Sequence, residues 1–526
     1  MAKASLAIVN AYVVTLNPGM PYARAVAVHG NEIVAVGSNE QIRDFVGPKT
    51  RVIDAKNGTL IPGLADCHVH MTGFGFLLQS VDLGSTDSIK EMQQKLQQYS
   101  RENPCETWIK GGRWDQERFV EKRLPTRWDL DEVINDRPVL LNRVCGHIAV
   151  ANSKALQLAG ITKETAIRGG KVDTDSKTDE PTGILRENAR DIVARLAPKP
   201  RLKQLEEACM LAAKKAIEAG LTCVHWMVES AEEIRVLRKL DSKGKLPLRV
   251  RLGVSIELLD KLWNSPLLKD SGKGMVKTGF IKILADGSLG AHTAALNSSY
   301  SDESKTRGML LYSQRTLENL VLKVHKVGSQ LAVHAIGDRA IGAVLKAYEK
   351  ALKAFPRADH RHRIEHCSVL NLSLIKRIKR LGVIVSVQPY FAVSDFWVVS
   401  RVGKKRARLV YPFKTLLRKG FVTISGSDCP VEDINPLLGI WAATTQNRPN
   451  ERMTIDEAVA SYTVNAAYAS FDEDRLGSVE AGKLADFTLL SENLHDICSN
   501  HVKKAMVKMT IVDGKPVYAR AKKALT

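Results

Sequence analysis

The chain has 526 residues, of which 44% are hydrophobic and 25% are charged, and its formal net charge at pH 7 is +20. This length is sufficient for a catalytic barrel with additions, and this composition excludes an intrinsically disordered chain. The positive charge is spread along helix-like stretches, and its densest run, residues 404–408, lacks the interleaved aromatic residues of a nucleic-acid platform. We therefore expect a solvated basic surface and no nucleic-acid partner, although an anionic partner for this run stays open.

The sequence contains no predicted export or membrane segment. The N-terminal apolar stretch, residues 6–16, lacks the cleavage site of a signal peptide, and no apolar run approaches the roughly 18–20 residues of a membrane span. Eight cysteines stand at irregular positions without a Cys-x-x-Cys pair, which predicts reduced thiols and no cysteine-type zinc site. We therefore expect a cytoplasmic protein without a membrane partner, and a homodimer as the default assembly.

Short β-rich runs separated by turns occupy both ends of the chain. The runs at the N-terminal end are residues 7–16, 25–29 and 33–36, and those at the C-terminal end are residues 486–490, 505–512 and 516–518. Two β-rich ends around a large α/β centre predict one small β-sandwich, assembled from residues 1–59 and 475–526.

Between the two ends, eight short apolar segments alternate with helical periodicity, which is the pattern of parallel βα units. The eight segments are residues 60–70, 221–227, 248–255, 279–285, 330–335, 363–368, 383–388 and 422–427. They predict an α/β fold, a (β/α)8 TIM barrel over residues 60–474. The first interval is far longer than a βα connection, so we expect an insertion over about 75–215 after barrel strand 1, forming a wall or lid over the active site.

Four histidines and an aspartate fall at the ends of these strands. His68 and His70 close the first strand, His334 ends the fifth, His366 lies near the end of the sixth, and Asp428 follows the eighth. Alternate residues of a strand point to the same side, so His68 and His70 can reach one metal ion. A lone histidine near a strand end is more often a hydrogen-bonded structural residue. The combination favours a site for Zn²⁺ or a related divalent ion, because barrel active sites are built from strand ends.

At these motifs the sequence resembles the amidohydrolase superfamily, and most closely the branch that includes N-substituted formamide deformylases. The motifs that carry the resemblance are LIPGLADCHVH (60–70), PTGILRE (181–187), KILADGSLG (282–290), TAAL (293–296), HAIGD (334–338), RIEH (363–366), GSDCP (426–430) and GKLAD (482–486). They span nearly the whole chain.

The resemblance implies two zinc-like divalent ions per chain. One ion would be bound by His68, His70 and Asp428, the second by His334 and His366, and a carboxylated Lys282 would bridge the two. A sequence cannot display a modification, so an unmodified lysine beside one ion, or in a salt bridge with Asp286, stays open.

Two further residues receive roles from this resemblance. Asp428 would accept a proton from the attacking water and deliver it to the departing amine, and a purely structural ligand is the alternative. His147, in the RVCGH motif of the insertion, would bind the substrate, and a structural histidine is equally open. Five aromatic residues are expected to form either an apolar substrate wall or core packing: Trp114, Tyr390, Phe391, Phe396 and Trp397.

The predicted activity is hydrolysis of a non-peptide C–N bond, in an amide, a formamide or a related small-molecule substrate. The same metal site acting on an ester, a lactone or an amino-substituted ring is the first alternative. A metal-free scaffold protein is the second, and the complete set of ligands disfavours it.

Overall fold

The computed structural model describes residues 3–167, 169–263, 265–269 and 274–520. Its centre is a parallel sheet in the order β21-β20-β19-β18-β17-β16-β15-β8, and every predicted barrel strand is present. The bounds are β8 (Leu64–Val69), β15 (Leu221–Val228), β16 (Arg249–Ser255), β17 (Val276–Leu284), β18 (Gln330–Ala335), β19 (Arg363–His366), β20 (Ile384–Val387) and β21 (Thr423–Ser425). The segments after β8 and β21 are joined where Asp428 N donates to His68 O and His70 N donates to Cys429 O, each at 2.8 Å. The sheet is therefore a nearly closed barrel.

Alternation along the strands separates a polar interior from an apolar exterior. In β19, Arg363 and Glu365 are fully buried and form an ion pair, while Ile364 between them packs in the main hydrophobic core. Helices cover the outside, for example α8, whose Ser230 accepts from Glu233 N at its start and whose Ile234, Leu237 and Leu240 are buried. Such an N-cap contributes about 1 kcal/mol. The covering helices are α7 (Leu202–Glu218), α8 (Ala231–Ser242), α9 (Ile256–Leu262), α10 (Gln314–Lys326), α11 (Asp338–Ala354), α12 (Leu372–Leu381), α15 (Phe413–Arg418), α16 (Pro436–Thr445), α17 (Ile455–Ser461) and α18 (Val464–Ala469).

The insertion after barrel strand 1 folds around its own sheet, in the order β13-β14-β12-β11-β10-β9. Trp114 is fully buried in the core of this unit, where its Nε1 donates to Leu141 O at 2.8 Å, so it is a packing residue and no part of a substrate wall. The helix α7 contacts α2 (Met71–Leu77), α8 and β15 and thus belongs to the barrel, which ends the insertion earlier than predicted. The strands are β9 (Val81–Asp82), β10 (Ile109–Trp114), β11 (Val139–Arg143), β12 (Ile148–Ala151), β13 (Gly170–Thr174) and β14 (Pro181–Glu187), with helices α3 (Ile89–Glu102), α4 (Arg127–Asp131), α5 (Ser153–Leu158) and α6 (Asn188–Ala194).

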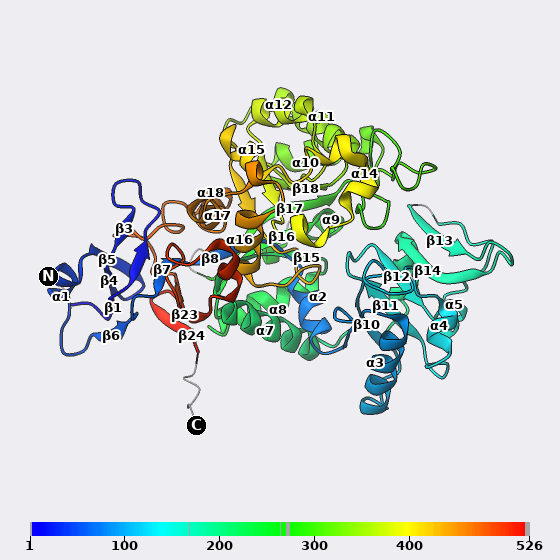
Figure 1. Ribbon diagram of the computed structural model, residues 1–526, viewed down its shortest axis with the longest axis horizontal. Helices are drawn as coiled ribbons and strands as arrows, with labels where there is room; N and C mark the ends of the chain where they lie inside the picture. Colours follow the sequence, from blue (N-terminus) through cyan, green and yellow to red (C-terminus); the bar gives the residue numbers. More distant parts are fainter. Residues whose placement is uncertain (1–2, 168, 264, 270–273, 521–526) are drawn as a thin grey trace.

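Strands from both termini form two further sheets, as expected for the β-sandwich, on the opposite side of the barrel from the insertion (Figure 1). The predicted first barrel strand is in fact divided, because β7 (Thr59–Pro62) pairs with β22 (Phe487–Leu490) of the terminal unit and only β8 enters the barrel. The remaining terminal strands are β1 (Leu6–Val9), β2 (Tyr12–Val14), β3 (Tyr22–Ala23), β4 (Ala25–His29), β5 (Glu32–Gly37), β6 (Arg51–Asp54), β23 (Val507–Val512) and β24 (Lys515–Ala519).

The terminal unit is joined to the barrel by a buried ion pair, in which Arg249 Nε lies 2.7 Å from Asp486 Oδ2. The domain limits of 1–59 with 475–526, and of 60–474, stay a prediction, and residues 521–526 lie outside the described residues. Within the described ranges, every helix is too short or too polar to cross a bilayer.

Candidate metal centre

Three predicted ligands meet at the C-terminal mouth of the barrel. One ligand atom from each of His68, His70 and Asp428 lies within 4.8 Å of the others, and this is the only such group of three among the described residues. Asp428 Oδ1 lies 3.4 Å from the Nε2 atoms of both histidines. His68 lies near the end of β8 and His70 directly follows the strand, so both side chains point to the same side of it. The hydrogen bond from Asp428 N to His68 O brings the Asp428 carboxylate next to them.

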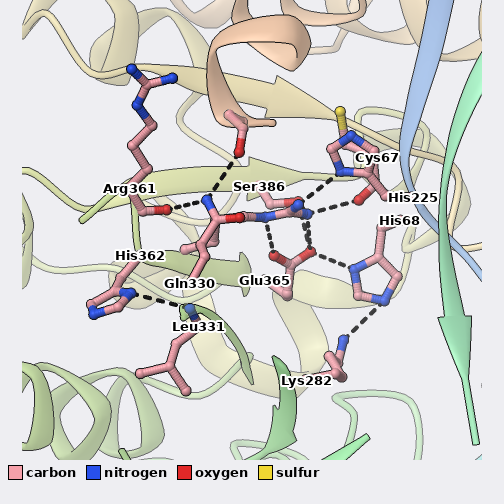
Figure 2. A network of polar contacts seen from close by, with 12 residues as sticks. Cys67, His68, His225, Lys282, Gln330, Leu331, Arg361, His362, Glu365 and Ser386 are labelled. Atoms are coloured by element: carbon pink, nitrogen blue, oxygen red, sulfur yellow. Dashed lines mark hydrogen bonds and ion pairs between the residues drawn. The ribbon is translucent and has the colours of Figure 1, made fainter. Parts of the chain in front are cut away.

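The orientation of His68 is set by a buried carboxylate. Glu365 Oε2 lies 2.5 Å from His68 Nδ1, and Glu365 also accepts from Ser386 Oγ (2.8 Å) and pairs with Arg363 (2.7 Å). Because a carboxylate accepts, Nδ1 carries the hydrogen and Nε2 keeps its lone pair for a cation. Figure 2 shows His68 between Glu365 and Lys282. Burial lowers the pKa of His68 well below its usual value, so the ring is neutral.

Lys282 faces the metal ligands rather than a salt-bridge partner. Its Nζ lies 3.1 Å from His68 Nε2, and burial lowers the pKa of its ammonium group to about 8. The salt bridge with Asp286 that the sequence left open is not formed. Asp286 is fully buried and instead accepts from the backbone N–H groups of Ala295 (2.8 Å), Ile336 (3.0 Å) and Gly337 (2.9 Å).

His334 and His366 lie beside this group, with their ring centroids 4.5 Å apart and His366 4.8 Å from His68. His334 Nε2 donates to Gly287 O (3.1 Å), and His366 Nδ1 contacts Gln388 Oε1 (2.7 Å). The opposite nitrogen of each ring, Nδ1 of His334 and Nε2 of His366, is left with its lone pair. Burial lowers the pKa of both rings well below the usual value, so both are neutral, as metal ligands must be.

The insertion contributes His147 to the same place. Its ring centroid lies 5.7 Å from that of His334, and its Nδ1 lies 2.9 Å from Glu187 Oε2. Burial alone would lower the pKa of His147, but the Glu187 carboxylate outweighs burial and raises this pKa to about 9. The ring is therefore an imidazolium at neutral pH.

Two further histidines of the barrel region do not join this group. His225 contacts Arg363 through Nδ1 and Ser470 through Nε2, each at 2.8 Å, and His292 contacts Asp302 at 3.2 Å. Three polar groups support the centre, namely Glu365, Asp286 and Glu187. The sequence assigned no role to Glu365 or Glu187 and indicated Asp286 only as a salt-bridge partner of Lys282. Each stands inside a motif that carries the family resemblance, and that position was the available signal.

A cavity of about 510 Å³ adjoins the centre, between the insertion and the loops that follow barrel strands seven and eight. Phe391 lines it and stacks on His366 with ring centroids 6.1 Å apart, which connects the cavity to the ligands. Burial raises the pKa of two carboxyl groups in its lining, Asp395 to about 7 and Glu432 to about 8. The aromatic residues expected as a substrate wall that do line the cavity are Tyr390, Phe391, Phe396 and Trp397.

The donor set fits a divalent cation, because neutral imidazole nitrogens and a carboxylate converge with their lone pairs inward. A cation at this position is supported further by known proteins. The model of the amidohydrolase family matches residues 51–518. YtcJ of Bacillus subtilis, whose name places it among the amidohydrolases, is 35% identical over 515 residues, which are 94% of this chain and 96% of that protein. The N-substituted formamide deformylase of Arthrobacter pascens is 29% identical over 542 residues and covers 98% of each chain.

Among solved structures, an uncharacterized metal-dependent hydrolase from Pyrococcus furiosus superposes with a TM-score of 0.75 at 30% identity. The match covers 93% of this chain and 99% of that one, so the barrel, the insertion and the terminal strands are all shared. This chain belongs to the amidohydrolase family and is a metal-dependent hydrolase.

Proposed function

We propose that the protein hydrolyses a non-peptide C–N bond in a small amide or formamide, with a zinc-like ion held by His68, His70 and Asp428. The observation that carries this proposal is the convergence of these three ligands within 4.8 Å beside an aromatic-lined cavity. The choice of bond is supported by the relative from Arthrobacter pascens, which is named for deformylation of N-substituted formamides.

We propose a second ion, held by His334 and His366, with Lys282 as the bridge. Carbon dioxide adds to a neutral amine to give a carbamate and a released proton. Burial lowers the pKa of Lys282 to about 8, which raises the neutral fraction of its amine at physiological pH. The resulting carboxylate would replace an ammonium group that repels cations. The Lys282 Nζ atom, to which the carbon dioxide would add, lies 3.1 Å from His68 Nε2, which supports that role.

When bound, a divalent cation supplies Lewis acidity that activates water and polarises a carbonyl group. The Asp428 carboxylate, beside the ligand histidines, accepts the proton of the attacking water and delivers it to the departing nitrogen. His147 donates a hydrogen bond from its free ring nitrogen to the substrate carbonyl. The aromatic lining of the cavity binds the apolar substituent of the substrate and excludes water from it.

The first experiment is elemental analysis of the protein purified without chelator and in the presence of bicarbonate. We expect about two ions per chain in the wild type, and fewer in His68→Ala, His334→Ala and Lys282→Ala. One ion that survives Lys282→Ala would overturn the bridge and leave a mononuclear hydrolase. A wild-type chain without metal and without hydrolysis of any substrate would favour the metal-free scaffold.

The second experiment identifies the bond that is cleaved. Purified enzyme is incubated with parallel panels of N-substituted formamides, other amides, esters, lactones and amino-substituted rings, and released amine, acid or ammonia is measured. We expect amine release from formamides or amides. Faster release from esters, lactones or amino-substituted rings would replace the C–N proposal with ester, lactone or deaminating chemistry at the same site.

Two predictions about the cellular setting are retained as part of this proposal. The described cysteines are free thiols, as a reducing cytoplasm requires, and fractionation of the native host would test that location. The homodimer is tested by analytical ultracentrifugation of the full chain.

A further inference from the structure

One buried carboxylate near the centre belongs to the insertion rather than to the barrel. Glu187 ends β14, and His147 immediately precedes β12, which pairs with β14 in antiparallel register. Glu187 N donates to His147 O at 2.9 Å. The sheet of the insertion therefore brings the two side chains together, independently of the barrel strands.

The side chains of His147 and Glu187 form an ion pair that uses only one of the two ring nitrogens of His147. His147 Nδ1 lies 2.9 Å from Glu187 Oε2, and the side chains are 19% and 6% exposed. The ring faces His334, at a centroid distance of 5.7 Å. Within the described part of the chain, no hydrogen-bond partner is found for His147 Nε2. That atom is therefore available to a substrate between the insertion and the barrel.

The backbone around Glu187 is adapted to hold this position. Glu187 has a φ of +51°, a left-handed conformation that residues other than glycine adopt only where the surroundings enforce it. Its Oε1 lies against Gly287, where a Cβ atom would come within 2.5 Å of that oxygen. The carbonyl of the same Gly287 accepts from His334 Nε2 at 3.1 Å. Gly287 thus contacts both the insertion pair and a predicted metal ligand.

We propose that Glu187 is a positioning residue that holds the His147 ring with Nε2 directed at the substrate, so that the insertion supplies a polar contact that the barrel lacks. This inference rests on the proposed function, in which His147 binds the substrate. Glu187 does not touch the substrate itself. It acts through His147, and Gly287 leaves the space that this arrangement requires.

A double-mutant cycle tests the coupling, with hydrolysis of N-substituted formamides as the readout. Glu187→Ala and His147→Ala are each expected to lower kcat/KM by about 10- to 100-fold, the range of one hydrogen bond to a charged group. The double variant should lose no more than either single variant, because both remove the same interaction. Losses that multiply would overturn the proposal. Glu187→Gln, which keeps an acceptor for Nδ1, should recover part of the rate.

The matched control removes a different ion pair from the same hairpin and leaves the contact between Glu187 and His147 in place. Asp173 contacts Arg186, the neighbour of Glu187, at 2.7 Å across β13 and β14. Asp173→Ala should leave kcat/KM within about two-fold, since a part-buried pair away from the substrate contributes to folding only. Gly287→Ala should also lower kcat/KM, because the new Cβ atom would overlap Thr293 Oγ1 as well as the Glu187 carboxylate. A Gly287→Ala enzyme with wild-type kcat/KM would contradict the close approach.

A measurement without substrate keeps the inference separate from the proposed function. In protein labelled with ¹⁵N-histidine, the signals of His147 are assigned by their loss in His147→Gln. Glu187→Ala should shift the Nδ1 signal of His147, and Asp173→Ala should not. An unchanged signal in Glu187→Ala overturns the inference whether or not the enzyme cleaves formamides. Failure of the proposed function would appear instead as missing metal or missing hydrolysis, with the Glu187-dependent shift intact.

Discussion

Two histidine clusters occupy opposite ends of the same barrel, and only one of them is arranged for a ligand. At the mouth, His68, His334 and His366 each use one ring nitrogen for a supporting protein group and turn the other inward, where His68 Nε2 faces Lys282 Nζ at 3.1 Å. At the base, His325 and His362 use both ring nitrogens. Leu331 N donates to His362 Nδ1 (3.1 Å), His362 Nε2 lies 2.9 Å from His325 Nδ1, and His325 Nε2 lies 2.7 Å from Phe355 O.

The difference teaches that burial and proximity of histidines do not make a metal centre. Both clusters are buried, and burial lowers the pKa of the rings in both. What distinguishes the mouth is that the remaining lone pairs turn toward one place beside the Asp428 carboxylate, where His68 Nε2 meets Lys282 Nζ at 3.1 Å. The base is a closed chain of hydrogen bonds that ends on a backbone carbonyl, so it contributes to stability alone. Figure 2 shows a histidine of each cluster: His362 of the base, which accepts a hydrogen bond from Leu331 N, and His68 of the mouth, which faces Lys282.

Among substitutions that separate the mouth cluster from the base cluster, we expect the largest effect from Asp428→Asn at the mouth. The variant keeps the shape of the side chain but removes the charge that completes the ligand group and accepts the proton. Hydrolysis of the best substrate should fall by about 10²- to 10⁴-fold, the usual range for loss of a general acid–base group. The thermal unfolding midpoint of the metal-free protein should stay near that of the wild type. A variant that retains more than about a tenth of the rate would exclude Asp428 as the proton acceptor.

The second contrast concerns the support of His68. Glu365→Gln keeps the size of the side chain but weakens the hydrogen bond that fixes the tautomer of His68, and metal affinity should fall by about 10- to 100-fold. Affinity is measured by competition with a chromophoric chelator. Ser386→Ala, which removes the 2.8 Å hydrogen bond to Glu365 and a longer one from Arg363 (3.5 Å), serves as the graded control and should lose less. Equal affinities in all three proteins would show that the orientation of His68 does not depend on Glu365.

The barrel strands, and the meeting of the candidate ligands at the mouth of the barrel, could be predicted because both follow from local patterns. Apolar strands that alternate with helices indicate βα units, and residues at strand ends meet at the mouth of a barrel. The supporting groups could not be assigned in this way. Glu365 contacts His68 from 297 residues away, and Glu187 meets Gly287 only because the insertion folds back over the barrel. Nothing local separates such a carboxylate from an ordinary strand residue.

The division of residues 60–70 escaped prediction for a related reason. Pro62 and Gly63 are the local sign of a boundary, but a glycine inside a strand pattern also fits a bulge. The segment is divided by its pairing, because β7 pairs with β22 and β8 pairs with β15. Gly63 lies between the two strands, packed so closely against Thr222 that a Cβ atom would overlap the threonine side chain. Pairing partners hundreds of residues away decide where the strand ends.

A third contrast is expected at the base, where substitution should affect folding and leave the metal in place. His362→Leu removes the acceptor of Leu331 N–H and leaves His325 Nδ1 without a partner, which should cost about 1–3 kcal/mol in the free energy of unfolding. Metal content should equal that of the wild type. His362→Asn, which retains an acceptor near Leu331, should cost less. Loss of metal from His362→Leu in its folded state would break the distinction between the two clusters.

The smallest effect is the pH dependence that the base cluster gives to stability. Burial, followed by the charges of His360, Arg357 and His325, lowers the pKa of His362 well below the value of about 6.5 expected in the unfolded chain. Below pH 6.5 the unfolded state therefore binds a proton at His362 that the folded state does not bind. The free energy of unfolding falls as the pH falls. Above about pH 7.5 neither state binds that proton, so the contribution is complete and constant.

The slope should reach about 1.4 kcal/mol per pH unit for each such histidine below pH 6.5. Other buried histidines, including those at the mouth, add slopes of the same sign, so the wild-type profile alone does not isolate the base. The difference between wild type and His362→Asn isolates the base cluster, because every group that does not contact His362 cancels. Thermal unfolding from pH 5 to pH 8, with metal removed from both proteins, should therefore give curves that converge as the pH falls. Parallel curves would mean that His362 titrates in the folded protein as it does in the unfolded chain, which its two hydrogen bonds to Leu331 and His325 oppose.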